Sequence, residues 1–200
     1  MAKKALDRRI PRTRALLQRA LHSLLRKKDY ETITIKDICA AAKVGRSTFY
    51  AHYTSKDDLK RRGFEPLRRQ LVERQQEALR TARDVRSRSL AFSLTMFEHA
   101  RDHREHYRAL VGSRGGAVSL GVIRKMLSDL VRDELAATSE KSVADEIPRE
   151  FVVQYVVGAY MAVLTSWLDG GAKLPPQKIN AMFCRLATEG ILSAYKRRVS

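Results

Sequence analysis

The stretch TITIKDICAAAKVGRSTFYAHYTSKDDL, residues 32–59, decides the fold. Thr34 and Asp37 have the spacing of a capping box, in which two side chains cap the first turn of a helix. An apolar stripe with helical spacing follows and predicts a short helix over residues 35–42, whose buried face carries Ile35, Ile38, Cys39 and Ala42.

The helical pattern breaks at Val44-Gly45 and resumes over residues 46–53. Phe49 and Tyr53 are four residues apart on one face of this second helix, and we expect them in the core of a small domain. A short helix, a tight turn that contains glycine and another short helix form the layout of a helix-turn-helix.

Longer helices are predicted on both sides of this motif. Upstream, Pro11 suits the first turn of a helix, and a stripe of leucines continues to about residue 28. Downstream, Ser55 is the expected N-cap of a long helix over residues 56–81, which Pro66 either kinks or breaks. Further helices are expected at about 86–103, 105–111, 117–137, 148–169 and 176–197. No segment alternates as a strand does, so the predicted fold class is all-α, with about nine helices.

Positive charge is concentrated at the N-terminal end of the chain. The net charge is +17, and residues 1–62 hold 17 Lys and Arg against 6 Asp and Glu, a net +11. A basic run can serve solubility alone, but here the cations interleave with a well-patterned helical segment. This distribution favours a polyanionic partner such as nucleic acid.

Residues 32–59 closely resemble the DNA-binding signature of the TetR family of bacterial regulators. The match includes the Thr-Phe-Tyr-x-His-Tyr core and the Ser-Lys-Asp-x-Leu opening of the next helix. Lys43 stands where the family's turn often has glycine, and Gly45 stands where a serine often caps the recognition helix. The resemblance implies a three-helix DNA-binding domain at residues 1–56 and a helical sensor and dimerisation domain at residues 57–200.

The second helix of such a motif places its N-terminal residues at base edges, while flanking groups hold phosphates. Arg46 can give paired hydrogen bonds to guanine, and Thr48 offers a hydroxyl and a methyl group to thymine. Thr34 and Lys56 lie at helix N-termini that can meet a phosphate, although Thr34 can equally be a plain cap. Tyr50 and His52 match family positions that contact the DNA backbone. The expected DNA-binding residues are Thr34, Lys36, Arg46, Ser47, Thr48, Tyr50, His52 and Lys56.

A second resemblance lies near the other end, at residues 151–158 followed by Trp167-Leu168-Asp169-Gly170-Gly171 and Pro175-Pro176. It is similar to the C-terminal domain of a TetR subgroup in which an aromatic-rich helix ends in a Trp-Leu-x-x-Gly-like turn. This resemblance implies a homodimer held by a four-helix bundle, with residues 148–197 supplying most of the interface. Residues 151–168 support it independently, because they are apolar almost all round, as a helix buried on two sides should be.

Histidines and cysteines carry weaker signals. Three histidines fall at i, i+4 and i+7, the spacing by which two can bind a metal: His99, His103 and His106. Neighbouring arginines disfavour a bound cation, so a polar helix face is the preferred interpretation. Cys39 and Cys184 lack a CxxC or zinc-type neighbour and are expected to be small buried hydrophobes. No metal, cofactor or catalytic residue is predicted.

Aromatic and methionine residues of the sensor helices could line a ligand cavity or form plain core: Phe92, Met96, Tyr107 and Tyr155. The charged start of the chain, and the lack of any run near the roughly 18 uncharged apolar residues that span a bilayer, predict a cytoplasmic protein without a membrane partner.

The predicted function is that of a sequence-specific regulator that binds a palindromic operator in double-stranded DNA as a homodimer. We expect a repressor that responds to an unidentified small molecule or protein. The alternative is a transcriptional co-activator whose C-terminal domain docks a partner protein. An enzyme is not expected, since the sequence has no nucleophile elbow, phosphate-binding glycine loop or HExxH motif.

Overall fold

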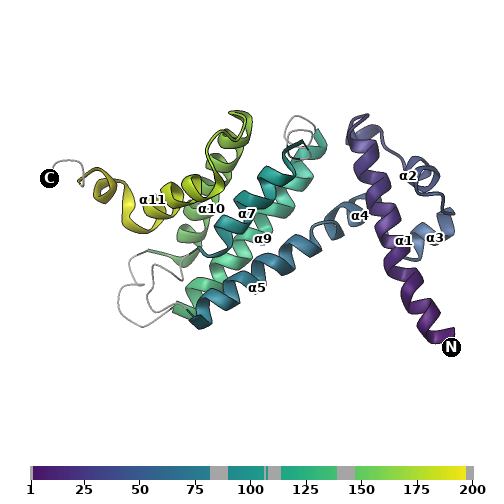
Figure 1. Cartoon of the computed structure of the whole chain (residues 1–200), viewed down its shortest axis with the longest axis horizontal. Helices are drawn as coiled ribbons and strands as arrows, with labels where there is room; N and C mark the ends of the chain where they lie inside the picture. The colour runs from purple at the N-terminus through teal and green to yellow at the C-terminus, as the bar shows by residue number, and fades with distance from the viewer. Residues whose placement is uncertain (1, 82–89, 106, 108–113, 139–146, 197–200) are drawn as a thin grey trace. The chain divides into compact units, whose positions relative to one another are not determined.

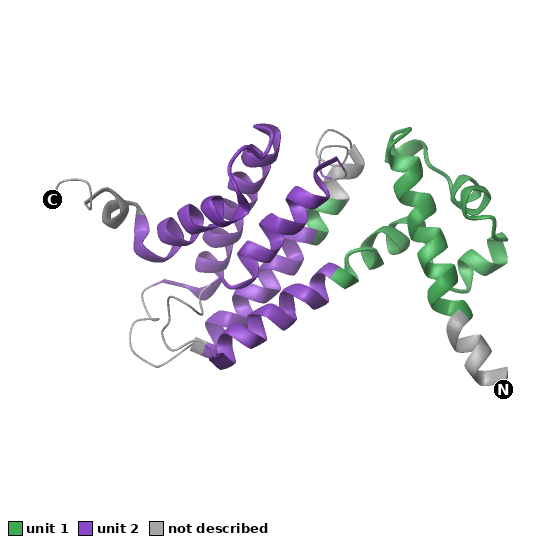
Figure 2. Ribbon diagram, in the orientation of Figure 1, with its two compact units in different colours: residues 1–66, 108–122 green, residues 67–107, 123–200 purple. Residues whose placement is uncertain are grey.

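The structure is a computed structural model that describes residues 2–81, 90–105, 107, 114–138 and 147–196. Every regular element in these residues is helical, which confirms the predicted all-α class (Figure 1). The chain divides into two compact units, residues 1–66 with 108–122 and residues 67–107 with 123–200 (Figure 2).

The first unit contains the predicted helix-turn-helix. Its elements are α1 (Ala2–Leu25), the 3-10 helix η1 (Tyr30–Thr32), α2 (Ile35–Ala42), α3 (Arg46–Tyr50) and α4 (Lys56–Arg62). The bounds of α2 are those predicted, and the capping box is present. The N–H of Asp37 donates to the hydroxyl of Thr34 at 3.1 Å, and the N–H of Thr34 donates to the carboxylate of Asp37 at 2.9 Å.

Helix α1 begins before the residue predicted to start it. It starts at Ala2 and contains Pro11 in its interior. Proline removes one backbone hydrogen bond from a helix, whereas Ala, Lys, Leu and Arg, which dominate the preceding residues, are strong helix formers. The expectation that Pro11 opens the helix was therefore wrong.

One hydrophobic core joins the helices of this unit. Its fully buried side chains come from α1, η1, the residue after η1, α2, α3 and α4: Leu17, Leu21, Tyr30, Ile33, Ile38, Phe49 and Leu59. Phe49 is completely buried and Tyr53 is 3% exposed, which confirms their predicted core positions. The core includes Leu59, three residues beyond the domain boundary expected after residue 56. That boundary stays a prediction.

The long helix expected over residues 56–81 is broken into α4 and α5 (Glu65–Thr81). The break is one of the two outcomes expected from Pro66. Proline at this position has no N–H for the carbonyl of Arg62, the last residue of α4. It is tolerated within the first turn of α5, where backbone N–H groups have no intrahelical acceptor.

The second unit is built from α7 (Phe92–Asp102), α10 (Arg149–Asp169) and α11 (Pro176–Lys196), with most of α5 and of α9 (Arg114–Thr138). Helix α7 starts later than the predicted residue 86, because Leu90 has a φ of 58°, which a right-handed helix cannot include. Most of the helix predicted at 105–111 lies outside the described residues. Tyr160 is central to the core, with ring centroids 4.8 Å from Phe97 and 5.0 Å from Phe183.

The composition of helix α10 differs from one expectation drawn from the sequence. It is long and apolar enough to cross a membrane by length and composition alone, although the sequence was expected to contain no such run. In the structure, 44% of its most apolar 18-residue window is buried inside the protein. Core helices of folded domains have the same composition, because they are packed on more than one side.

Replacing Thr34 by alanine should lower the free energy of unfolding by about 1 kcal/mol, because the α2 N-terminus loses its hydroxyl cap. The N–H of Thr34 and the ammonium of Lys28 lower the pKa of Asp37 to about 2. Since this folded-state pKa lies below the unfolded value, the carboxylate's contribution is present above about pH 4 and is lost as the pH falls toward 2. Urea denaturation of Thr34→Ala at pH 7 measures the contribution of the hydroxyl cap to the free energy of unfolding, and Thr34→Ser, which keeps a hydroxyl, is the control. Equal free energies of unfolding for the two variants would contradict the predicted role of the cap.

Candidate nucleic-acid interface

A tight turn between α2 and α3 sets the direction of the second helix. Lys43 adopts the left-handed conformation, with φ 54° and ψ 45°, that glycine adopts most readily. The N–H of Val44 then donates to the carbonyl of Cys39 at 3.0 Å and closes the end of α2. Lysine thus provides the turn at the position where related sequences often have glycine. Gly45 is the N-cap of α3 and has no side chain to cap it.

Helix α3 has one buried residue among exposed ones. Phe49 faces the core, while Arg46 and Ser47 are exposed and Thr48 is partly exposed. Tyr50 is 51% exposed, and its ring meets that of Phe49 edge-on with centroids 5.5 Å apart. The predicted base-reading residues therefore lie at the N-terminal end of α3, on the parts of the helix that Phe49 does not anchor.

The flanking predicted contacts lie on other elements of the same unit. Thr34 is the exposed N-cap of α2, and Lys36 is exposed in its first turn. His52 follows α3 and is partly buried, with its ring centroid 6.5 Å from that of Tyr53. DNA contact by all of these residues stays a prediction.

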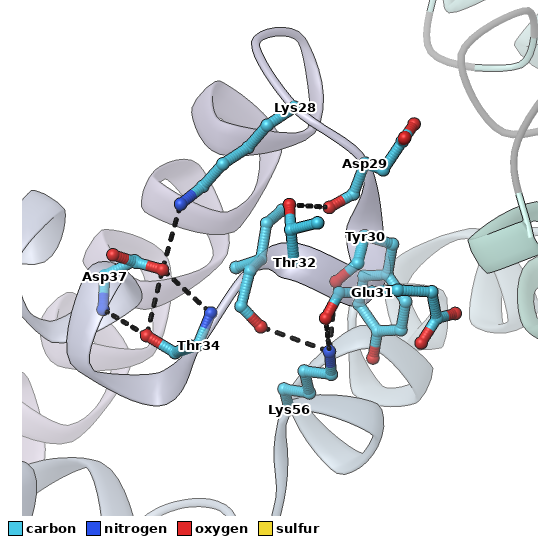
Figure 3. A network of polar contacts seen from close by, with 9 residues as sticks. Lys28, Asp29, Tyr30, Glu31, Thr32, Thr34, Asp37 and Lys56 are labelled. Carbon is cyan, nitrogen blue, oxygen red and sulfur yellow. Dashed lines mark hydrogen bonds and ion pairs between the residues drawn. The ribbon is translucent and has the colours of Figure 1, made fainter.

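Lys56 has a different environment from the one predicted (Figure 3). Its ammonium donates to three backbone carbonyls around η1, those of Tyr30 at 3.0 Å, Glu31 at 3.2 Å and Ile33 at 3.1 Å. An ammonium has three N–H donors, so these carbonyls use all of them. In this arrangement Lys56 ties the start of α4 to the connection between α1 and α2.

A second lysine lies on the other part of the same cluster. The ammonium of Lys60 is 3.8 Å from the ring centroid of Tyr30, whose hydroxyl donates to Asp57. Lys60 is 4% exposed, and burial lowers its pKa to about 8. Burial and the carboxylate of Asp57 raise the pKa of the Tyr30 hydroxyl. The cluster thus holds α4 against η1, with the Tyr30 ring close to both the Lys56 and the Lys60 ammonium groups.

Sequence reasoning missed the partners in this network because they are distant in the chain. Lys28 pairs with the capping carboxylate of Asp37 at 2.9 Å across nine residues, and Lys56 bonds carbonyls more than twenty residues away. Helical spacing reports only neighbours three or four residues apart. No local pattern could have indicated these contacts.

The predicted ligand-binding residues occupy two environments in the second unit. Phe92, Met96 and Tyr107 are buried, whereas Tyr155 is 49% exposed. The Tyr107 hydroxyl is buried without a hydrogen-bond partner among the described residues. Ligand contact by these four residues stays a prediction.

The structure agrees with only some of the expectations for the positions of the histidines and cysteines. His99 and His103 stack with ring centroids 4.1 Å apart, while His106 lies outside the described residues. The described part of the chain contains no group of three or more potential metal ligands. Cys39 is buried as predicted, but Cys184 is only partly buried and lies 3.5 Å from the Ser93 hydroxyl. Describing Cys184 as a simple buried hydrophobe was wrong, because its thiol contacts polar groups.

Two family models cover most of the chain. One, described as "Bacterial regulatory proteins, tetR family", matches residues 17–62, and another, described as "Transcriptional regulator C-terminal region", matches residues 88–189. The chain belongs to the TetR family of transcriptional regulators. Membership identifies a DNA-binding regulator and not an enzyme, as the sequence predicted.

A curated HTH-type relative matches a short part of the chain. The uncharacterized HTH-type transcriptional regulator YxbF of Bacillus subtilis (strain 168) is 49% identical over 57 residues, which are 28% of this chain and 15% of that protein. The chain therefore shares only a small part of that relative's length.

Solved structures of transcriptional regulators share the fold over nearly the whole chain. A putative regulator from Syntrophomonas wolfei has a TM-score of 0.72 at 17% identity, with 91% of this chain and 95% of that chain covered. A regulator from Streptococcus agalactiae has a TM-score of 0.59 at 24% identity, covering 92% and 98%. FadR from Bacillus subtilis, solved with stearoyl-CoA, has a TM-score of 0.63 at 14% identity, covering 88% and 98%.

Replacing Lys56 by methionine should lower the free energy of unfolding by about 2 kcal/mol, because three carbonyls lose a charged donor. Lys36→Met, at an exposed position, should change it by less than about 0.5 kcal/mol. Chemical denaturation of the full chain measures both. If Lys56 instead holds a phosphate, its variant would keep the stability of the wild type and lower the salt dependence of DNA binding by about one ion per subunit.

Proposed function

We propose that this TetR regulator is a cytoplasmic homodimeric repressor that binds a palindromic operator and leaves it when an effector binds the second unit. The observation that carries the proposal is the apolar stripe, a set of large apolar side chains on α10 and α11 that a single chain leaves exposed. Its large exposed side chains are Phe151 at 66%, Tyr155 at 49%, Met182 at 50% and Leu186 at 41% exposed.

The stripe follows the geometry of two neighbouring helices. Phe151 and Tyr155 are four residues apart on α10, and Met182 and Leu186 are four residues apart on α11, so each pair shares a helix face. Large apolar side chains that share an exposed helix face support an interaction surface. A second copy presents the same two helices, which supports a four-helix interface between subunits.

The dimer would present two recognition helices to DNA. A two-fold symmetric protein matches a palindromic site, in which each α3 reads one half. Arg46 is exposed in the first turn of α3, and its planar guanidinium suits the O6 and N7 atoms of guanine. These features support sequence-specific reading of an operator by Arg46, Ser47 and Thr48.

The proposed effector acts through the second unit. FadR of Bacillus subtilis, which shares the fold, was solved with stearoyl-CoA and provides a first ligand to try. Phe92, Met96 and Tyr107 are the candidate contacts, because they are buried in this unit. Tyr155 is better suited to the dimer stripe. An effector releases DNA only when it binds one arrangement of the subunits more tightly than the other.

Replacing Arg46 by alanine should weaken binding to the operator by about 1 to 3 kcal/mol per half-site, because a base contact is lost. Binding to a scrambled duplex should change much less. The operator is first obtained by selecting bound fragments of the host genome, and fluorescence anisotropy then measures both duplexes. Lys36→Ala, at a proposed phosphate contact, should weaken both duplexes alike. Equal losses on the two duplexes for Arg46→Ala would show that Arg46 does not read a base.

A Tyr155→Asp/Met182→Asp double variant should weaken dimerisation at least about a hundredfold, because it buries two carboxylates in the proposed interface. Sedimentation velocity at micromolar concentration measures the change. Ala136→Asp on α9 adds a carboxylate at another exposed helical position and is the control. An unchanged dimer would overturn this interface. It would favour the co-activator alternative, in which the stripe docks a partner protein.

A further inference from the structure

Helix α1 begins well before the first of its described side chains that is fully buried. It starts at Ala2, its described side chains begin at Arg9, and Leu17 is the first of these to be fully buried. At 1.5 Å per residue, the turns before Leu17 extend for about 22 Å. Within its described side chains, Arg9, Arg12 and Arg14 are exposed.

The part of the chain that follows Asp7 is basic without compensation. Residues 8–28 contain eight Lys and Arg and no Asp or Glu. Arg12 and Arg19 are seven residues apart on one exposed side of α1, and Arg9 lies one turn before Arg12. Among the described side chains, none of these three arginines has a hydrogen bond or an ion pair.

Other exposed helices of the same protein balance their cations. In α5, Arg74 pairs with Glu77 at 3.0 Å, and in α9 both Lys125 and Arg132 pair with Asp129 at 3.4 and 3.0 Å. Such pairs stabilise a helix slightly, whereas like charges one turn apart destabilise it by a similar amount. Helix α1 contains one carboxylate, Asp7, and residues 8–28 that follow it contain none. The arginines after Asp7 therefore have no acidic neighbour later in the helix, which leaves them available to an external polyanion.

We infer that the exposed arginines of α1, Arg9, Arg12 and Arg19, form a second DNA-binding surface that holds phosphates of the operator duplex outside the base pairs read by α3. Duplex DNA carries one negative charge per about 1.7 Å of its axis, so a basic helix can meet several phosphates. The guanidinium fork suits phosphate oxygens better than an ammonium does. The inference rests on DNA binding by the family, and it does not depend on the proposed dimer or effector.

The experiment compares an Arg9→Gln/Arg12→Gln variant with the wild type on a 30-base-pair duplex of arbitrary sequence, about three helical turns. Glutamine retains high helix propensity, so the helix should remain. Fluorescence anisotropy between 50 and 200 mM salt, a range of about fourfold, gives the slope of log affinity against log salt. The matched control is Arg124→Gln/Lys173→Gln, which removes two exposed positive charges from the second unit.

The α1 variant should lose about two units of salt slope per subunit, and at 0.1 M salt its affinity should fall by at least about tenfold. The control should keep the slope of the wild type. Circular dichroism and thermal unfolding verify that both variants keep their helices and stability. A wild-type slope for the α1 variant, or an equal loss in the control, would overturn the inference. Because the wild type is measured on the same duplex, failure of the α1 surface is distinguished from failure of DNA binding itself.

Discussion

Burial of Phe49 is the interaction on which the DNA-reading part of the molecule depends. Helix α3 spans five residues, and an isolated helix of that length is not stable in water. Phe49 is completely buried, and its ring lies 5.9 Å from that of Tyr53 in the same core. Burying one phenylalanine side chain contributes about 2 kcal/mol. Arg46 and Tyr50 lie in the same short helix as Phe49. The inward position of Phe49 therefore also determines that Arg46 and Tyr50 point outward.

The cations of the first unit serve two physical roles. Buried charge is costly unless polar partners surround it. The partners of Lys56 are three carbonyls, and the ring of Tyr30 lies beside both Lys56 and Lys60. Carbonyls and an aromatic ring carry no net charge, while the carboxylates of Asp57 and Glu31 also favour the charged form of Lys60. The net charge of residues 1–62 is still +11. The unit therefore keeps a positive field for DNA while it uses lysines as structural ties.

Two parts of α10 have different environments in the second unit. One part of the helix packs inside the unit, where the hydroxyl of Tyr160 donates to the carbonyl of Ser93 at 3.0 Å and its ring meets three other aromatic rings. Another part leaves Phe151 and Tyr155 uncovered. The near absence of polar residues along this helix follows because both its buried face and its exposed face are apolar. A helix with an apolar stripe on one side alone would have only one of these two apolar faces.

Much of the first unit was determined by local sequence. The capping box of Thr34 and Asp37 and the stripe of Ile35, Ile38 and Ala42 predicted the bounds of α2, and Pro66 predicted the interruption between α4 and α5. These features depend on residues within one or two helical turns, so the order of the amino acids is sufficient. It is also why the resemblance to TetR proteins could be recognised over a short continuous stretch.

Tertiary structure decided what local sequence could not. The partners of Lys56, the environment of Lys60 and the exposed position of Tyr155 depend on residues brought together from distant parts of the chain. Lys56 has the position of a phosphate ligand in the sequence but the contacts of a structural tie in the fold. The physical reason is that side-chain periodicity specifies which face of a helix is buried, whereas packing between elements specifies which atoms that face meets.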